Sequence, residues 1–246
     1  MSTTIQPTID IRRGGERFLT KIDWLDSRHS FSFGPHHDAE NTNHGLLLVS
    51  NDDVIEAGSG FSTHPHRDME IVTWVLSGEL EHKDSTGNVG LIYPGLAQRM
   101  SAGRGILHSE INAANDAPVH LVQMWVLPDT DKIAPSYSQL DINAELARGG
   151  LVPVASGRGH DAAISIQQKG AVLWAARLAP GERVSLPEAN FVHFYVAKGE
   201  VTGAELGTLV AGDAARLTIA GKLAVSAGPA GAEVLVWEMD QGVRFN

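Results

Sequence analysis

The sequence contains no cysteine among its 246 residues, which excludes disulfides and thiolate metal ligands. Any metal must therefore be held by nitrogen and oxygen atoms. Basic residues are also scarce, since 19 lysines and arginines face 29 acidic residues and the net charge is -10. A chain of this charge is poorly suited to nucleic acid, because contacts to phosphates need a basic face.

Long apolar runs are missing as well. No stretch is long enough to cross a bilayer, and the first residues lack the charged and apolar parts of a signal peptide. We therefore expect a cytoplasmic protein that binds neither a membrane nor nucleic acid directly.

Short strand patterns separated by turns fill most of the chain. Residues 70–76 are rich in β-branched and aromatic side chains, which favour strands. The 26 glycines and 11 prolines are scattered and mark many turns. The best helical candidate, residues 140–147, is short and lies in an apparent connector at 128–150. The pattern predicts an all-β protein built as a sandwich or barrel.

The two halves of the chain resemble each other in three places and in the same order. Residues 74–80 match 195–201, residues 94–100 match 211–217, and residues 121–125 match 233–237. Repeated similarity in one order indicates duplication of a structural unit. We therefore expect two tandem antiparallel β-barrels, with the first unit at residues 1–135 and the second at 136–246.

Histidines and carboxylates alternate at both ends of the stretch 64–110. Alternate residues on a strand point to the same face, so His64 and His66 can share one face, and His108 and Glu110 can share another. If these strands face each other, three imidazoles and a carboxylate converge in a metal site. Parity also allows Glu70 as the carboxylate, on the assumption that residues 64–70 form one strand.

The second half lacks such a set. Aligning the repeats places side chains that are poor ligands opposite every candidate ligand: Ser185, Pro187, Phe191, Val225 and Ala227. The sequence therefore predicts one metal per chain, in the first unit.

Two groups of residues resemble the motifs of the cupin superfamily. The first is Gly58, His64-x-His66, Glu70 and Gly78, with one extra residue before the last glycine. The second is Gly105-Ile106-Leu107-His108 followed by Asn112, with Gly103 where cupins usually have proline.

The match is closer still to the pirins, a two-cupin branch of that superfamily. It is carried by six stretches: residues 27–34, 51–53, 60–70, 78–88, 94–95 and 102–110. One departure is Pro35-His36-His37-Asp38, where pirins commonly have an aromatic residue followed by an Asp-Pro turn.

The pirin resemblance implies a bicupin fold, with a metal-binding cupin in residues 1–135 and a degenerate cupin without ligands in 136–246. It favours Glu110 as the fourth ligand, beside His64, His66 and His108. Glu70 then becomes a candidate for orienting one of the ligands without binding the metal itself. Such donors bind one divalent transition metal, for which we expect Fe2+, while manganese, cobalt, nickel, copper and zinc suit the same atoms. Phe61, Met69, Met100 and Ile106 are candidates for apolar pocket walls, although each also suits a packed core.

Some pirins resemble quercetinases, cupin dioxygenases that open the flavonol ring with O2. By that analogy a small aromatic or flavonol-like substrate binds the metal through its deprotonated 3-hydroxyl group, and Glu110 is a candidate catalytic base. The alternative implied by eukaryotic pirins is a non-catalytic, iron-binding protein that responds to redox state and regulates a protein partner. A metal-dependent isomerase is a third class.

Overall fold

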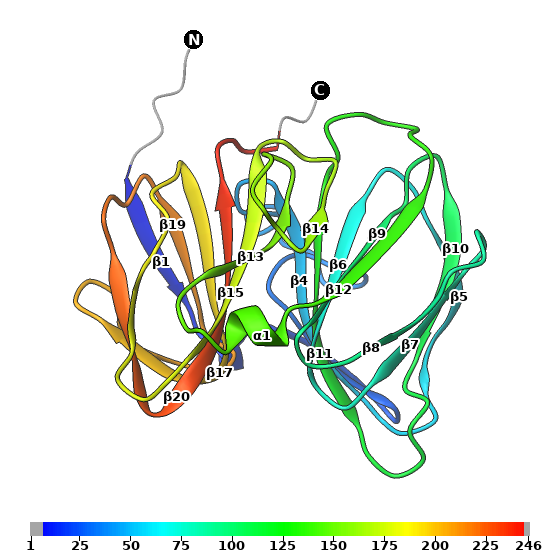
Figure 1. Cartoon of the computed structure of the whole chain (residues 1–246), viewed down its shortest axis with the longest axis horizontal. Helices are drawn as coiled ribbons and strands as arrows, with labels where there is room; N and C mark the ends of the chain where they lie inside the picture. The colour runs from blue at the N-terminus through cyan, green and yellow to red at the C-terminus, as the bar shows by residue number, and fades with distance from the viewer. Residues whose placement is uncertain (1–6, 244–246) are drawn as a thin grey trace.

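The computed structural model describes residues 7–243 and consists almost entirely of β-strands (Figure 1). Two barrels lie side by side, one formed mainly by the N-terminal half and one mainly by the C-terminal half. The predicted all-β, two-barrel fold is confirmed. No helix in residues 7–243 is both long and apolar enough to cross a membrane.

The first barrel is made of two sheets. The larger sheet has the order β12 (Ser136–Asp141), β9 (Leu96–Ser101), β6 (Glu70–Ser77), β11 (Val119–Val126), β4 (Leu47–Ile55), β3 (Leu25–His29) and β2 (Phe18–Ile22). The smaller sheet has the order β5 (Gly60–His66), β10 (Ile106–Ile111), β7 (Leu80–Asp84) and β8 (Val89–Ile92).

The second barrel is a single sheet of nine strands. Its main path is β1 (Thr8–Arg12), β19 (Ala214–Thr218), β17 (Phe191–Gly203), β20 (Ala224–Met239), β15 (Ala171–Leu178), β13 (Val152–Ser156) and β14 (Ile164–Ser165). β16 (Arg183–Ser185) pairs with β20, and β18 (Gly207–Val210) pairs with β17. A 3-10 turn, Gly14–Glu16, follows β1.

Strands are exchanged between the two halves of the sequence. The N-terminal strand β1 pairs with β19 of the second barrel, and β12 pairs with β9 of the first barrel. In Figure 1 the blue β1 accordingly lies among the orange and yellow strands. The predicted boundary at 135/136 thus falls just before a strand of the first barrel, and the division into units at 1–135 and 136–246 stays a prediction.

The helical prediction for residues 140–147 is wrong in its extent. Leu140 belongs to β12, and only Asn143–Leu146 form the short helix α1. Pairing of β12 with β9 supplies backbone partners that an isolated connector lacks, so tertiary context overrides the local helical preference.

The core between the barrels explains why some strands are apolar on both faces. In β6, Val72, Trp74 and Leu76 pack towards the second barrel, whereas Ile71 and Val75 belong to clusters inside the first barrel. A strand covered on both faces reads as a continuous apolar run instead of an alternating one. β6 and β11 therefore form a wall shared by both barrels. One face of each strand packs towards the second barrel, and the other face lines the interior of the first.

Candidate metal centre

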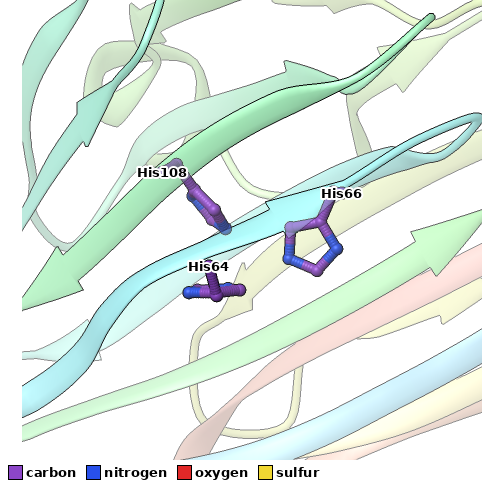
Figure 2. A group of neighbouring side chains, drawn as sticks. All are labelled: His64, His66 and His108. Atoms are coloured by element: carbon purple, nitrogen blue, oxygen red, sulfur yellow. The ribbon is translucent and has the colours of Figure 1, made fainter.

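His64, His66 and His108 lie together inside the first barrel (Figure 2). β5 and β10 pair antiparallel, with His108 directly opposite His64 and Ile106 opposite His66. One ligand nitrogen from each histidine lies within 4.8 Å of the others. The ring centroids of His64 and His108 are 4.4 Å apart, and those of His66 and His108 are 4.9 Å apart. Cross-strand pairing thus turns a separation of more than 40 residues into direct proximity.

The ring nitrogens fit a metal. Nδ1 of His64 lies 2.8 Å from the carbonyl oxygen of Ser62, which can only accept, so this nitrogen carries a proton and Nε2 is left free. The Nε2 atoms of His66 and His108 are buried and have no hydrogen-bond partner within residues 7–243. Free imidazole nitrogens that converge are a preferred donor set for divalent first-row metals.

The environment keeps two of these rings neutral. Burial lowers the pKa of His66 to about 4, and the nearby His108 and His64 lower it further in the same direction. Burial, together with His64 and His82, lowers the pKa of His108 to about 3. Because a metal binds the neutral imidazole, both rings are ready to bind over the physiological pH range.

Glu110 lies beside His108 on β10 and is buried. Its carboxylate accepts hydrogen bonds from Nε2 of Gln123 at 2.7 Å and from Oγ1 of Thr73 at 3.3 Å. The β5–β10 register shifts between His108 and Glu110. Gly60 faces this bulge, and a Cβ atom there would collide with the backbone of Glu110. These contacts hold the carboxylate next to the histidines, and its role as a metal ligand stays a prediction.

Glu70 lies elsewhere. β5 ends at His66 and β6 begins at Glu70, with a turn between them in which Asp68 has a φ of 47°. The expectation that residues 64–70 form one strand is therefore wrong, and the turn resets the parity. Glu70 accepts hydrogen bonds from Ser101 Oγ at 2.8 Å and the Gln167 amide at 3.1 Å, on the side of β6 that faces the second barrel.

His82 is a site residue that the sequence analysis missed. It is fully buried, and one ligand atom from each of His82, His108 and Glu110 lies within 4.8 Å of the others. Nδ1 of His82 is 3.4 Å from Nδ1 of His108, and Nε2 is 3.4 Å from Oδ2 of Asp84. The alternation in Leu80-Glu81-His82-Lys83-Asp84 was the available signal, because it places His82 on the inward face.

Asp84 can determine which ring nitrogens of His82 and His108 carry protons. Hydrogen bonds from Asn88 and Thr86 outweigh burial and lower the pKa of Asp84 to about 2, so its carboxylate is ionised. An acceptor at Nε2 of His82 favours a proton there and leaves Nδ1 of His82 to accept from Nδ1 of His108. That arrangement directs the free Nε2 of His108 towards the other two histidines.

A cavity of about 410 Å³ reaches this cluster from one side of the barrel. Its lining includes His64 and Glu110, four aromatic side chains and several polar groups. The aromatic residues are Trp24, Phe33, Phe61 and Trp125. Asp53 lies in the same lining and is hydrogen-bonded by Ser27. Burial, with the charges of Asp52 and Glu110, raises the pKa of Asp53 to about 7.

A second cavity, of about 610 Å³, borders His66 on the other side. Of the predicted wall residues, Phe61 lines the first cavity, and Met69 and Ile106 line the second. Met100 is a core residue, only 1% exposed, and it packs with Ile71. Trp125 borders both cavities.

Comparison with known proteins gives consistent matches along most of the chain. Residues 12–126 match the Pirin family model, and residues 153–239 match a model described as quercetinase C-terminal cupin domain. A protein of Mycobacterium tuberculosis named putative quercetin 2,3-dioxygenase is 58% identical over 94% of this chain and 95% of its own length. Quercetin 2,3-dioxygenase of Escherichia coli K12 is 40% identical over 79% of this chain and 83% of its own.

Solved structures agree with the sequence relatives. The crystal structure of the bacterial pirin YhhW from Escherichia coli in complex with nickel(II) has a TM-score of 0.86 and 35% identity, and the match covers 96% of this chain and 100% of that one. Two family models align with the two halves of the chain, and a 58% identical relative spans almost all of it. The chain therefore belongs to the pirin family.

Proposed function

We propose that this protein is a metal-dependent dioxygenase that opens the central ring of quercetin-like flavonols with O2. The observation that carries the proposal is the cavity that ends on His64 and Glu110, because it offers a small molecule direct access to the metal-binding face. The names of the Mycobacterium tuberculosis and Escherichia coli relatives support the same substrate class.

The shape and chemistry of the cavity suit a flat polyphenol. Its volume of about 410 Å³ lies in the ordinary range for small-molecule sites. Aromatic faces on Trp24, Phe61 and Trp125 can stack on fused rings. Asn51 and Gln123 line the same space and can bond to the substrate's hydroxyl and carbonyl groups.

We propose that His64, His66, His108 and Glu110 hold one divalent ion, most fittingly Fe2+. Manganese, cobalt, nickel, copper and zinc suit the same nitrogen and oxygen donors, and a relative binds nickel(II). When bound, a redox-active ion supplies the one-electron and Lewis-acid chemistry that O2 requires. The residues of the chain orient the ion and enclose the substrate.

Glu110 is placed to handle the proton of the substrate's 3-hydroxyl group. Its carboxylate borders the cavity, and hydrogen bonds from Gln123 and Thr73 fix its direction. Asp53 lines the same cavity with a pKa of about 7, so it can take up a proton near neutral pH. Two carboxyl groups with different environments can therefore share the proton transfer.

The test is O2 uptake with quercetin by iron-loaded protein, with carbon monoxide measured in the same vessel. We expect one O2 consumed and one carbon monoxide released for each quercetin, and loss of both in a His64→Ala variant. Equal, negligible O2 uptake by the two proteins would contradict the proposal for this substrate.

A Glu110→Gln variant separates proton transfer from structure. The amide preserves the size of the side chain and an acceptor for Gln123, but it cannot act as a base at neutral pH. Among variant molecules that retain metal, we expect turnover to fall about 100-fold or more. Glu79→Gln, at an exposed turn, is the matched control. Unchanged turnover in metal-loaded Glu110→Gln would refute the role of Glu110 as base.

The alternative is a non-catalytic, redox-responsive metalloprotein that acts through a protein partner. It predicts full metal loading without O2 uptake for any member of a flavonol panel. A metal-dependent isomerase would change the substrate and leave O2 untouched. The same assay therefore separates the three classes.

A further inference from the structure

A small cavity with a strongly basic lining lies apart from the metal centre. Its volume is about 210 Å³, and it is formed by the chain after β1, the loop after β3, and β19. Its lining contains four arginines and two acidic residues: Arg12, Arg13, Arg17, Arg216, Glu16 and Asp38. Both acids are exposed, and so are Arg12 and Arg13, which pair with Asp10 and Asp213. The buried positive charge of the lining therefore comes from Arg17 and Arg216.

Arg216, on β19, is buried without a carboxylate at ion-pair distance in the described part of the chain. Its Nη1 donates to Oδ1 of Asn41 at 2.7 Å, and its Nη2 donates to the carbonyl oxygen of Ser30 at 2.5 Å. Its Nε has no hydrogen-bond partner within residues 7–243. Its Cζ also lies 4.3 Å from the ring centroid of Phe31. Neutral acceptors and an aromatic face thus hold the guanidinium in place, and no carboxylate balances its charge.

This guanidinium remains charged under physiological conditions. Burial, followed by the nearby Arg12, lowers the pKa of Arg216 to about 10, which is still well above neutral. A buried cation without a partner is costly, and natural structures normally provide a counter-ion. The Asp10 carboxylate next to it is already paired with Arg12 at 2.8 Å.

Arg17 contributes further free donors. Its side chain is only 5% exposed, and its Nη2 lies 3.3 Å from Oδ2 of Asp52 and 3.3 Å from the hydroxyl of Tyr195. Its Nε and Nη1 are buried and have no hydrogen-bond partner within residues 7–243. The hydroxyl of Ser30 is in the same state. Nδ1 of His29, which lines the same cavity, also has no partner within residues 7–243. Four side chains around one cavity thus carry unsatisfied polar atoms, which is unusual in a folded protein.

We propose that this cavity binds a small oxyanion, a phosphate or a carboxylate, between Arg17, Arg216 and Ser30. The free Nε–H of Arg216, the free N–H groups of Arg17 and the hydroxyl of Ser30 are donors that the oxygens of either group can accept from. A volume of about 210 Å³ is below that of sites for drug-sized molecules, which favours a small anion. The site needs no metal, so it is independent of the dioxygenase proposal.

Isothermal titration of the full-length protein tests the proposal. Inorganic phosphate, succinate and acetate are titrated separately at constant ionic strength, with sodium chloride as the control for screening. We expect saturable binding of at least one oxyanion at one site per chain, together with a rise in the thermal unfolding midpoint. Binding by phosphate alone, or by the carboxylates alone, identifies the chemical class.

Variants locate the binding. Arg216→Gln removes the unpaired charge and is expected to weaken binding at least tenfold. Arg148→Gln, at an exposed position, is the matched control and should bind as the wild type does. His64→Ala should also bind normally, because the metal centre is a different site.

Ser30→Ala keeps both guanidinium groups and guards against a folding defect in Arg216→Gln. It is expected to weaken binding severalfold. The proposal is overturned if no oxyanion binds saturably, or if binding survives unchanged in whichever of these two variants folds.

Discussion

The two barrels share a fold but fill their interiors differently. The second barrel is packed by one continuous apolar cluster that includes Phe194, Leu209 and Val225. The first barrel has two separate apolar clusters, one around Leu80 and Val119 and a smaller one with Met100. Its remaining interior holds histidines, carboxyl groups and cavities. A barrel that provides a site gives up part of its own core.

Position-by-position comparison makes the contrast concrete. In the first barrel His64 pairs across the sheet with His108. In the second barrel Ser185 pairs with Ala224, and the neighbouring Val184 pairs with Val225. The same scaffold therefore accepts either ligands or small and apolar residues at the paired strands, as expected when function resides in a site and not in the fold.

The second barrel also stiffens the wall of the first. The largest apolar cluster lies between the barrels and includes Trp74 and Trp237. Nε1 of Trp74 donates to Oε1 of Glu233 at 2.7 Å, which ties β6 to β20. Thr73 and Gln123, which hold Glu110, lie on β6 and β11. We infer that packing against the second barrel keeps these two strands in position.

Replacement of a candidate metal ligand by alanine should have the largest effect, because it should change metal content in the first barrel and not in the second. His64→Ala removes one of the proposed ligands, and we expect metal content to fall from about one ion per chain to almost none. Ser185→Ala, at the aligned position of the second barrel, should leave metal content unchanged. Elemental analysis of both proteins measures this. Equal metal content in the two variants would contradict the proposal that only the first barrel holds the metal.

A cavity created in the second barrel should lower the stability of the protein and leave its metal affinity unchanged. Leu209 is fully buried in β18, and Leu209→Ala removes buried methyl groups and leaves a void. We expect the free energy of unfolding to fall by about 2–5 kcal/mol, measured by urea denaturation of the metal-free protein. Metal affinity of the folded variant should match that of the wild type. A large loss of affinity would show that the barrels are coupled more tightly than we infer.

His82 offers a finer test inside the first barrel. His82→Phe keeps a flat ring that can stack on Tyr137, where the native centroids are 4.8 Å apart, but removes the hydrogen bond to His108. We expect metal affinity to fall by about 10- to 100-fold with little change in fold. Competition with a chelating dye measures affinity, and circular dichroism checks the fold. Unchanged affinity would mean that His82 does not orient His108.

The last expected effect is on stability in mild acid. Burial lowers the pKa values of His66 and His108 to about 4 and about 3 in the folded chain, against 6.5 for an unperturbed histidine. Between these values the unfolded chain binds more protons, so the metal-free protein should become less stable as pH falls from 6.5 towards 4. Bound metal should oppose this loss by competing with protons. Thermal unfolding across this pH range, with and without metal, checks both statements.

The alternation of residues and the family motifs were sufficient to predict that His64, His66 and His108 lie together. Strand parity is a local property, so it can be read from the sequence. The position of Glu70 was not predictable in this way. The turn around Asp68 resets the parity, and nothing in the alternation marks where β5 ends. The strand β12 was missed for a related reason, since its partner β9 lies about 40 residues away.

The least predictable features depend on contacts between distant parts of the chain. His82 reaches His108 because β7 pairs with β10, a pairing that the sequence did not specify. Arg17 and Arg216 come from opposite ends of the chain and line one cavity because β1 joins the second barrel. Local patterns carry no information about such pairings, so the structure was needed to find them.

An anomalous diffraction map of iron-loaded crystals, collected at the iron absorption edge, would locate the proposed metal directly. We expect one strong peak per chain, in the first barrel, within bonding distance of His64, His66, His108 and Glu110. A peak in the second barrel, or one in the first barrel that excludes the three histidines, would contradict the proposal.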